Sequence, residues 1–356
     1  MGFNHYLTYA VAAGILIGGA DLATGNHLGL GAHFKEAVLL IGDFSLCALG
    51  LLILMPALAN AVSPLASVLA RLGFDPAVAA SVFAADAGGY PLAVNLAVDA
   101  DMGRFIGCMV CSMLGAGLID LPIARGIIPP EDNRFFMQGL LIGIISVPFG
   151  AVAGGFAAGF SMSAVLFNTI PVGILAALIG AGLWKIPETM VKLCAAFSRL
   201  LEAGAVIGLA LGAVSQLLDL TILPGILPFR EASELVFSMV LVLMGIYPLL
   251  RLLLRVLKTP LEALAARTGF RSETWFGGLI VSVNCFPAFK MYGEMDDRGK
   301  ILVSAWSVPM VAAFGDFVGF FSALDPEMIV PLIAAKLVSG VLSLTIGLLY
   351  TKNKTV

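Results

Sequence analysis

Long apolar segments recur along the whole chain and are separated by short polar connections. Several exceed the roughly 20 residues that a helix needs to cross a bilayer. This pattern predicts an all-α, polytopic integral membrane protein with about ten to eleven transmembrane helices. The eleven candidate spans lie at about residues 5–23, 37–62, 76–98, 102–126, 134–160, 161–185, 200–220, 232–257, 273–293, 301–324 and 328–350.

Composition strengthens this prediction. Hydrophobic residues make up 60% of the chain and charged residues 12%, with a mean hydropathy of +1.01, whereas about a quarter of a soluble domain is charged. No connection is long enough for a soluble domain, so we expect a single membrane domain over residues 1–356. The net charge is −3 and no basic stripe occurs, which excludes nucleic acid as a partner. The expected partners are the lipid bilayer and a small molecule that crosses it.

The chain carries a diverged internal repeat. Residues 64–74 and 260–270 share the pattern Pro-Leu-x-x-x-x-Ala-Arg-x-Gly-Phe at an offset of 260 − 64 = 196 positions. Without a gap, the same offset pairs Pro91 with Pro287, Asp101 with Asp297, Gly103 with Gly299 and Asp120 with Asp316. We therefore expect two structural repeats, at about 37–150 and 233–346. Transporters are often built this way, and a parallel or an inverted arrangement is left open.

Two spans carry residues that interrupt a helix at corresponding positions. Asp86-Ala-Gly-Gly-Tyr90-Pro lies in the middle of span 76–98, and Ser282–Pro287 is its equivalent in span 273–293. Adjacent glycines and prolines disfavour a continuous helix. Paired breaks near the bilayer midplane are typical of a transporter binding site. The alternative is two proline kinks that bind nothing.

Ionisable residues inside a membrane cost roughly 2.5–3.5 kcal/mol each, so each needs a reason. Asp316 stands among Phe314, Phe317, Phe320 and Phe321, and a carboxylate with aromatic neighbours suits an organic ammonium. An ion pair with Lys336 is the structural alternative. Asn168 and Asn284 both stand in Asn-x-x-Pro, where the amide can bind a substrate hydroxyl or a carbonyl freed by the kink. The candidate substrate-binding residues are Asp316, Asp86, Asn284, Asn168, Tyr90 and Phe320.

Other chemistry is poorly supported. Cys108-x-x-Cys111 has the spacing of zinc ligands but lies in an apolar span without a second ligand pair, so neither a metal nor a cofactor is expected. No hydrolase or phosphate-loop motif occurs, and an intramembrane aspartyl protease would need glycine where the chain has Ala313, so an enzyme is disfavoured. The loop Asp296–Lys300 is echoed at Asp99–Arg104, either as a solvated turn or as a repeated gate latch.

Taken together, these motifs make the chain similar to the EutH family of ethanolamine permeases. The segments that carry the resemblance are Asp86–Tyr90, Pro122–Pro129, Asn168–Pro171, Asn284–Pro287, Met295–Lys300, Gly315–Phe320 and Lys336–Gly340. The chain departs from the family pattern at Ala87 and Phe317. The resemblance implies a multi-pass protein of the bacterial cytoplasmic (inner) membrane that takes up ethanolamine by alternating access. A different small amine or a nucleoside-like solute, the coupling ion and a homo-oligomer are left open.

Overall fold

The computed structural model describes residues 3–82, 89–115, 124 and 126–352, and every regular element among them is helical. The α-helices are α1 (Phe3–Ala23), α2 (Gly31–Phe44), α3 (Gly50–Arg71), α4 (Gly89–Leu96), α5 (Ala100–Phe105), α7 (Asn133–Ala157), α8 (Met162–Lys185), α9 (Pro187–Leu218), α10 (Phe229–Thr268), α11 (Ser272–Val281), α12 (Cys285–Lys290), α13 (Asp297–Met310), α14 (Asp316–Leu324) and α15 (Ile329–Lys352). The short 3-10 or π-helical turns are η1 (Ser45–Leu49), η2 (Pro76–Val82), η4 (Ile106–Cys111), η5 (Pro130–Asp132), η6 (Tyr292–Glu294) and η7 (Pro326–Met328).

The expected all-α membrane architecture is confirmed. Within the described ranges, five helices are long and apolar enough to cross a membrane, namely α7, α8, α9, α10 and α15, and the bent pair within α3 brings the number to six. Of the remaining predicted spans, 273–293 and 301–324 fall on interrupted helices, and 76–98 and 102–126 lie partly outside the described residues. The expected ten to eleven spans therefore exceed the number of continuous helices, because spans such as 273–293 and 301–324 are each split in two.

Two helices run further than the sequence pattern suggested. The span expected at 200–220 falls on α9, which already begins at Pro187. The span expected at 232–257 falls on α10, which continues unbroken to Thr268 and so includes most of the repeated segment 260–270. Good helix formers such as Ala, Leu, Glu, Lys, Met and Arg make up 8 of the 15 residues of 185–199 and 7 of the 11 residues of 260–270, and they extend a helix readily. α10 ends where Gly269 takes a left-handed conformation at φ 75°.

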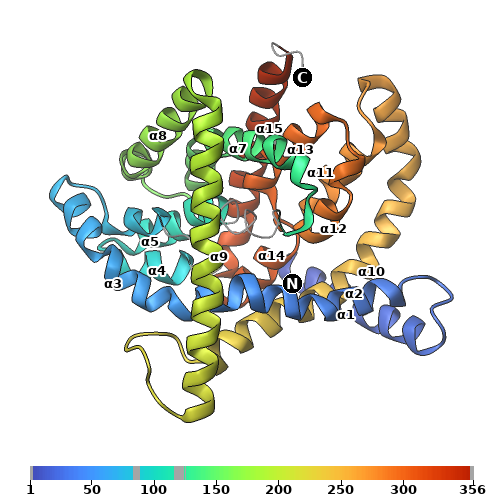
Figure 1. Ribbon diagram of the computed structural model, residues 1–356, viewed down its shortest axis with the longest axis horizontal. Helices are drawn as coiled ribbons and strands as arrows, with labels where there is room; N and C mark the ends of the chain where they lie inside the picture. The colour runs from blue at the N-terminus through green and yellow to red at the C-terminus, as the bar shows by residue number, and fades with distance from the viewer. Residues whose placement is uncertain (1–2, 83–88, 116–123, 125, 353–356) are drawn as a thin grey trace.

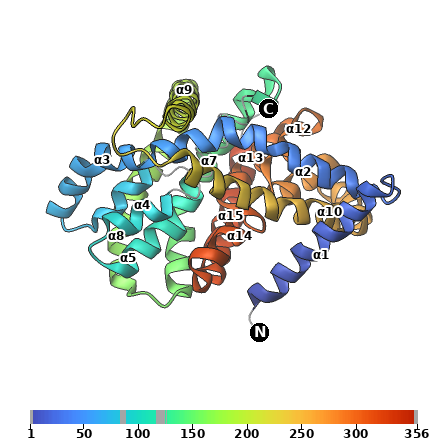
Figure 2. The same cartoon turned by 90° about the horizontal axis from the view of Figure 1, so that it is seen from below.

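The helices α7, α13 and α15 pack together in the middle of the molecule (Figures 1 and 2). A Cβ added at Gly154 would meet Pro331 and Ala335, and one added at Gly150 would meet Ala335 and Ser339. The contacts move backward along α15 as they move forward along α7. The two helices are therefore antiparallel, and small residues let them approach closely.

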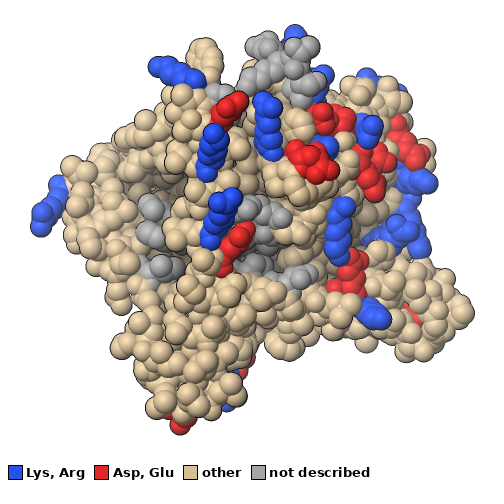
Figure 3. Space-filling model, viewed as in Figure 1, with Lys and Arg blue, Asp and Glu red and all other residues tan. Residues whose placement is uncertain are grey.

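The helices α8 and α9 lie at the periphery. Of the residues in an 18-residue apolar stretch of each helix, 18% are buried in α9, against 67% in the helix that contains α7. The exposed side chains of α8 and α9 include Phe167, Leu178, Trp184 and Leu217. In Figure 3 the charged side chains gather mainly over the upper and right parts of the face, and much of the rest carries no charged side chain. Apolar outer faces of this kind suit a lipid environment.

Two further helix contacts are reciprocal. Gly14 of α1 lies against Gly245 of α10, and Gly208 of α9 lies against Gly50 of α3. In both pairs an added Cβ would collide with the backbone of the partner helix, so only glycine permits the contact. The first helix of each half of the chain therefore packs on a helix of the other half, α1 on α10 and α9 on α3.

Element boundaries recur at the offset found in the sequence. Gly73 and Gly269, with 269 − 73 = 196, both have positive φ, at 87° and 75°, and follow the ends of α3 and α10. The helices α7 and α15 begin 329 − 133 = 196 residues apart. The turns η5 and η7, which begin 326 − 130 = 196 residues apart, directly precede α7 and α15.

Candidate functional site

The break predicted at Ser282–Pro287 is present. α11 ends at Val281, and Asn284 has an extended backbone with φ −161° and ψ 142° before α12 begins. The Asn284 Oδ1 accepts hydrogen bonds from the backbone N–H of Phe286 at 3.0 Å and from the Tyr247 hydroxyl at 2.9 Å. Asn284 thus caps α12 and links it to α10. The break predicted around Asp86 lies outside the described residues.

A second break, which the sequence analysis did not predict, splits span 301–324. α13 ends at Met310 and α14 begins at Asp316. Across the two breaks, the N–H of Ala312 donates to the Val281 carbonyl at 3.1 Å, and the N–H of Phe314 donates to the Ser282 carbonyl at 2.9 Å. The unwound segments therefore cross and satisfy each other's backbone groups. Non-helical backbone at membrane depth is tolerated where it is buried in protein or lines a cavity.

Lys336 reaches this crossing from α15. Its side chain is fully buried, and its Nζ lies 3.0 Å from the Pro309 carbonyl oxygen and 3.4 Å from that of Val311. The same ammonium lies 4.0 Å from the centroid of the Phe317 ring. A cation is thus held at the end of α13. Asp316 is the first residue of α14, and its side chain lies outside what the structure describes.

Tyr90 and Phe320, two of the candidate residues, come together. Their rings meet edge to face with centroids 6.5 Å apart, and Phe321 lies 5.1 Å from Tyr90. The Tyr90 hydroxyl donates to Asp325 at 2.7 Å. The chain order separates Tyr90 and Phe320 by 230 residues (320 − 90), so only the fold joins them.

Asp325 also binds Arg104 of α5. Arg104 donates from Nε and from one terminal nitrogen to the two carboxylate oxygens, each at 2.7 Å, and reaches Glu327 at 3.1 Å. Partial burial alone would raise the pKa of Asp325, but the hydrogen bonds from Arg104 and Tyr90 outweigh it and hold that pKa below its ordinary value. The cluster joins α4 and α5 to the start of η7.

Asn168 has a different position. Its Oδ1 accepts from the Asp75 N–H at 2.7 Å, and its Nδ2 donates to the Ala164 carbonyl at 3.0 Å. The amide therefore holds the segment that leads into η2. Figures 1 and 2 place α8, which carries Asn168, on the opposite side of the molecule from α12, so the structure does not bring Asn168 and Asn284 together.

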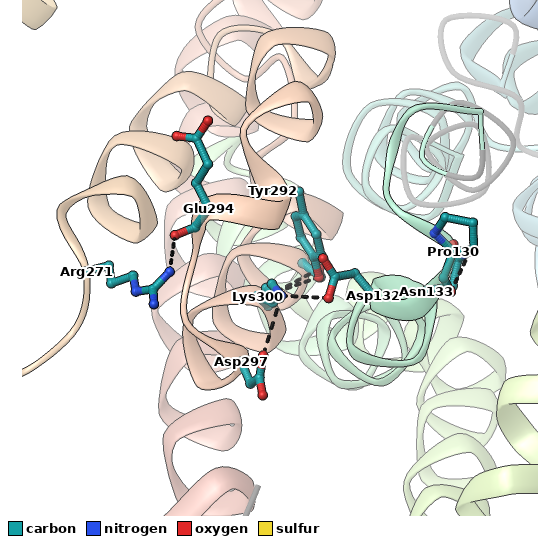
Figure 4. A network of polar contacts seen from close by, with 9 residues as sticks. Pro130, Asp132, Asn133, Arg271, Tyr292, Glu294, Asp297 and Lys300 are labelled. Atoms are coloured by element: carbon teal, nitrogen blue, oxygen red, sulfur yellow. Dashed lines mark hydrogen bonds and ion pairs between the residues drawn. The ribbon is translucent and has the colours of Figure 1, made fainter.

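A buried ion pair joins α13 to the turn before α7. Figure 4 shows Lys300 between Asp132 and Asp297, with Tyr292 beside it. The Lys300 Nζ lies 2.6 Å from Asp132 Oδ1, and the two side chains are 8% and 7% exposed. Sequence analysis placed Lys300 in a charged loop but missed this partner. The available signal was the repeat offset, since 300 − 104 = 196 relates Lys300 to Arg104.

Comparison with known proteins adds a family match. The family model described as "Ethanolamine utilisation protein, EutH" matches residues 3–350. "Probable ethanolamine permease EutH" of Listeria monocytogenes is 37% identical over 357 residues, which cover 99% of this chain and 95% of that protein. The protein of the same name from Escherichia coli is 33% identical, covering 90% and 85%, and "Uncharacterized protein YxeR" of Bacillus subtilis is 31% identical, covering 96% and 93%. No solved structure matches the chain.

Proposed function

The chain belongs to the EutH family of ethanolamine utilisation proteins, and from this membership we propose that it is a membrane permease that carries ethanolamine into the bacterial cytoplasm. The family match over nearly the whole chain carries the proposal. The multi-pass, all-helical fold agrees with it, and the family is one of permeases and not of enzymes. A transporter of another small amine or of a nucleoside-like solute is the alternative.

We propose that the substrate binds where the broken helices meet. Ethanolamine at neutral pH is a small ammonium that carries a hydroxyl, so its site needs an anion, a hydrogen-bonding group and apolar walls. Asp316 starts α14 beside the crossing, and we assign it the ammonium, with Asp86 second. The rings of Tyr90 and Phe320 supply walls, and Asn284 lies at the other break. The contacts of Asn168 favour a supporting role for it.

Two inverted repeats would provide alternating access. We assign α1–α7 to one repeat and α9–α15 to the other, with α8 as the connection, which extends the limits expected from sequence. The antiparallel packing of the equivalent helices α7 and α15 supports inversion, since parallel repeats would place their equivalent helices in parallel. The reciprocal contacts of α1 with α10 and of α9 with α3 agree. One repeat would rock against the other around a central site.

Each repeat contributes one cation to an ion pair with the other repeat. Arg104 of the first repeat binds Asp325 ahead of α15, and its equivalent Lys300 of the second binds Asp132 ahead of α7. Because α7 and α15 are antiparallel, their N-terminal ends point to opposite faces of the molecule. We propose that the two pairs close the pathway at opposite faces and open in alternation, which gives a role to the echoed loops found in the sequence.

Uptake of labelled ethanolamine into proteoliposomes tests the transport function. Wild type should accumulate label, excess unlabelled nucleoside should not compete, and Asp316→Asn and Asp86→Asn should each reduce uptake. Lack of uptake by folded wild-type protein would exclude the substrate. Full uptake by both variants would exclude the site.

Labelling with an impermeant maleimide tests the inverted arrangement. In a background in which the five native cysteines are replaced, Arg104→Cys and Lys300→Cys should react from opposite sides of the membrane. Excess ethanolamine should change the two labelling rates in opposite directions. Reaction of both positions from one side would rule out inverted repeats, whatever the substrate.

A further inference from the structure

The end of α13 presents carbonyl groups in the middle of a predicted span. Pro309 and Val311 lie at the last turn of α13 and just beyond it, where the helix no longer supplies N–H partners. A helix C-terminus carries partial negative charge. In transporters with broken helices, the C-terminal ends of half-helices and the carbonyl groups of unwound backbone coordinate the coupling ion, which is sodium or a proton. The chemistry of this break is therefore that of a cation site.

A side chain of the protein itself lies at that position. The Lys336 ammonium is 3.0 Å from the Pro309 carbonyl oxygen, 3.4 Å from that of Val311 and 4.0 Å from the centre of the Phe317 ring. Two carbonyl oxygens and an aromatic face are all cation acceptors. The side chain has no solvent exposure. A buried cation within a membrane span is costly, so its presence indicates a functional role.

The cation is present in one repeat and absent from the other. At the repeat offset, 336 − 196 = 140, and Leu140 of α7 is a buried apolar residue. The positive charge of Lys336 on α15 therefore has no counterpart at the equivalent position of α7. The Lys336 ammonium lies at the α13–α14 break, where the Pro309 and Val311 carbonyl oxygens accept it.

We propose that the Lys336 ammonium occupies the cation position of the α13–α14 break in place of a sodium ion, so that transport needs no sodium at this site. This inference rests on the proposed transport function for its uptake assay. It identifies Lys336 as a positioning residue that holds the broken helix in shape, and it predicts that removing the ammonium creates a vacancy for a small inorganic cation.

Three variants test the proposal. Lys336→Met removes the charge but fills the space, and it should lower ethanolamine uptake by at least about tenfold. Lys336→Ala removes the charge and leaves space, so its uptake should be low in N-methylglucamine buffer and rise several-fold with sodium or lithium. Lys258→Met, at an exposed lysine of α10, is the matched control and should leave uptake unchanged. Wild type should transport equally well in both buffers.

A thermal unfolding assay in detergent gives a second readout that needs no ethanolamine. Sodium should raise the melting temperature of Lys336→Ala and leave that of wild type, Lys336→Met and Lys258→Met unchanged. Stabilisation of wild type by sodium, or sodium-dependent uptake by wild type, would overturn the proposal. The proposal would also be overturned if folded Lys336→Met took up ethanolamine as fast as wild type. Failure of wild type to move ethanolamine would reject the transport function alone, since the melting comparison still decides the cation site.

Discussion

Replacing Asp132 by asparagine isolates the contribution of its ion pair with Lys300, which is more buried than the pair between Arg104 and Asp325. The substitution keeps the size of the side chain but removes the negative charge 2.6 Å from the Lys300 ammonium. Lys300 then keeps Asp297 at 3.4 Å, which is about half exposed, and the Phe135 ring at 5.5 Å. Neither replaces a buried carboxylate in direct contact.

The expected loss follows from the geometry. At an effective dielectric constant of about 20, the attraction between charges 2.6 Å apart is about 332/(20 × 2.6), or roughly 6 kcal/mol. Desolvation of the two ions offsets much of this attraction, and breaking a buried pair by removing one partner typically costs about 3–5 kcal/mol. Because Asp297 compensates in part, we expect Asp132→Asn to lower the free energy of unfolding by about 3 kcal/mol.

A double-mutant cycle measures this loss. The variants are Asp132→Asn, Lys300→Met and their combination, compared by denaturant unfolding in detergent, and the double variant should be much less destabilised than the sum of the singles. The control is the exposed pair Lys258–Glu262 at 3.9 Å, for which Glu262→Gln should cost no more than about 0.5 kcal/mol. The reasoning is refuted if Asp132→Asn is as mild as Glu262→Gln, or if the two single effects simply add.

Three further predictions concern close packing, capping and pH. Gly150→Ala should lower the melting temperature, since its Cβ would collide with α15, whereas Gly173→Ala meets open space and should leave the helix unchanged or more stable by about 1 kcal/mol. Asn284→Ala should cost about 1–2 kcal/mol in unfolding free energy through loss of the α12 cap, and Tyr247→Phe, which removes only its hydroxyl bond, about 1 kcal/mol. Since the pKa of Asp325 lies below its ordinary value of 3.8, its charge stabilises the fold above that value and this contribution disappears as the pH falls through the lowered pKa. The gap in melting temperature between wild type and Asp325→Asn should therefore persist from neutral pH to about pH 4 and close below it.

The unequal success of sequence analysis has identifiable causes. The break at Ser282–Pro287 was predictable because a proline and a capping asparagine disrupt local helix geometry. The break after Met310 was missed because the apolar run continues through it, with Pro309 and Gly315 as the only local signals. Similarly, Asn168 and Asn284 share the same local motif, but one holds η2 and the other caps α12. Local patterns report helix propensity and do not report which element an amide will face.

The sequence alone was sufficient to predict the membrane class, about half of the eleven spans and one of the breaks, because these follow from apolar length and backbone chemistry along the chain. Only the tertiary structure decided which charges meet. Arg104 and Lys300 are equivalent in sequence, but their partners lie 221 and 168 residues away. The packing of α7, α13 and α15 determines which side chains meet, and it also brings Lys336 to the end of α13. Partners so far apart along the chain are determined by packing in three dimensions, and local sequence patterns carry no information about it.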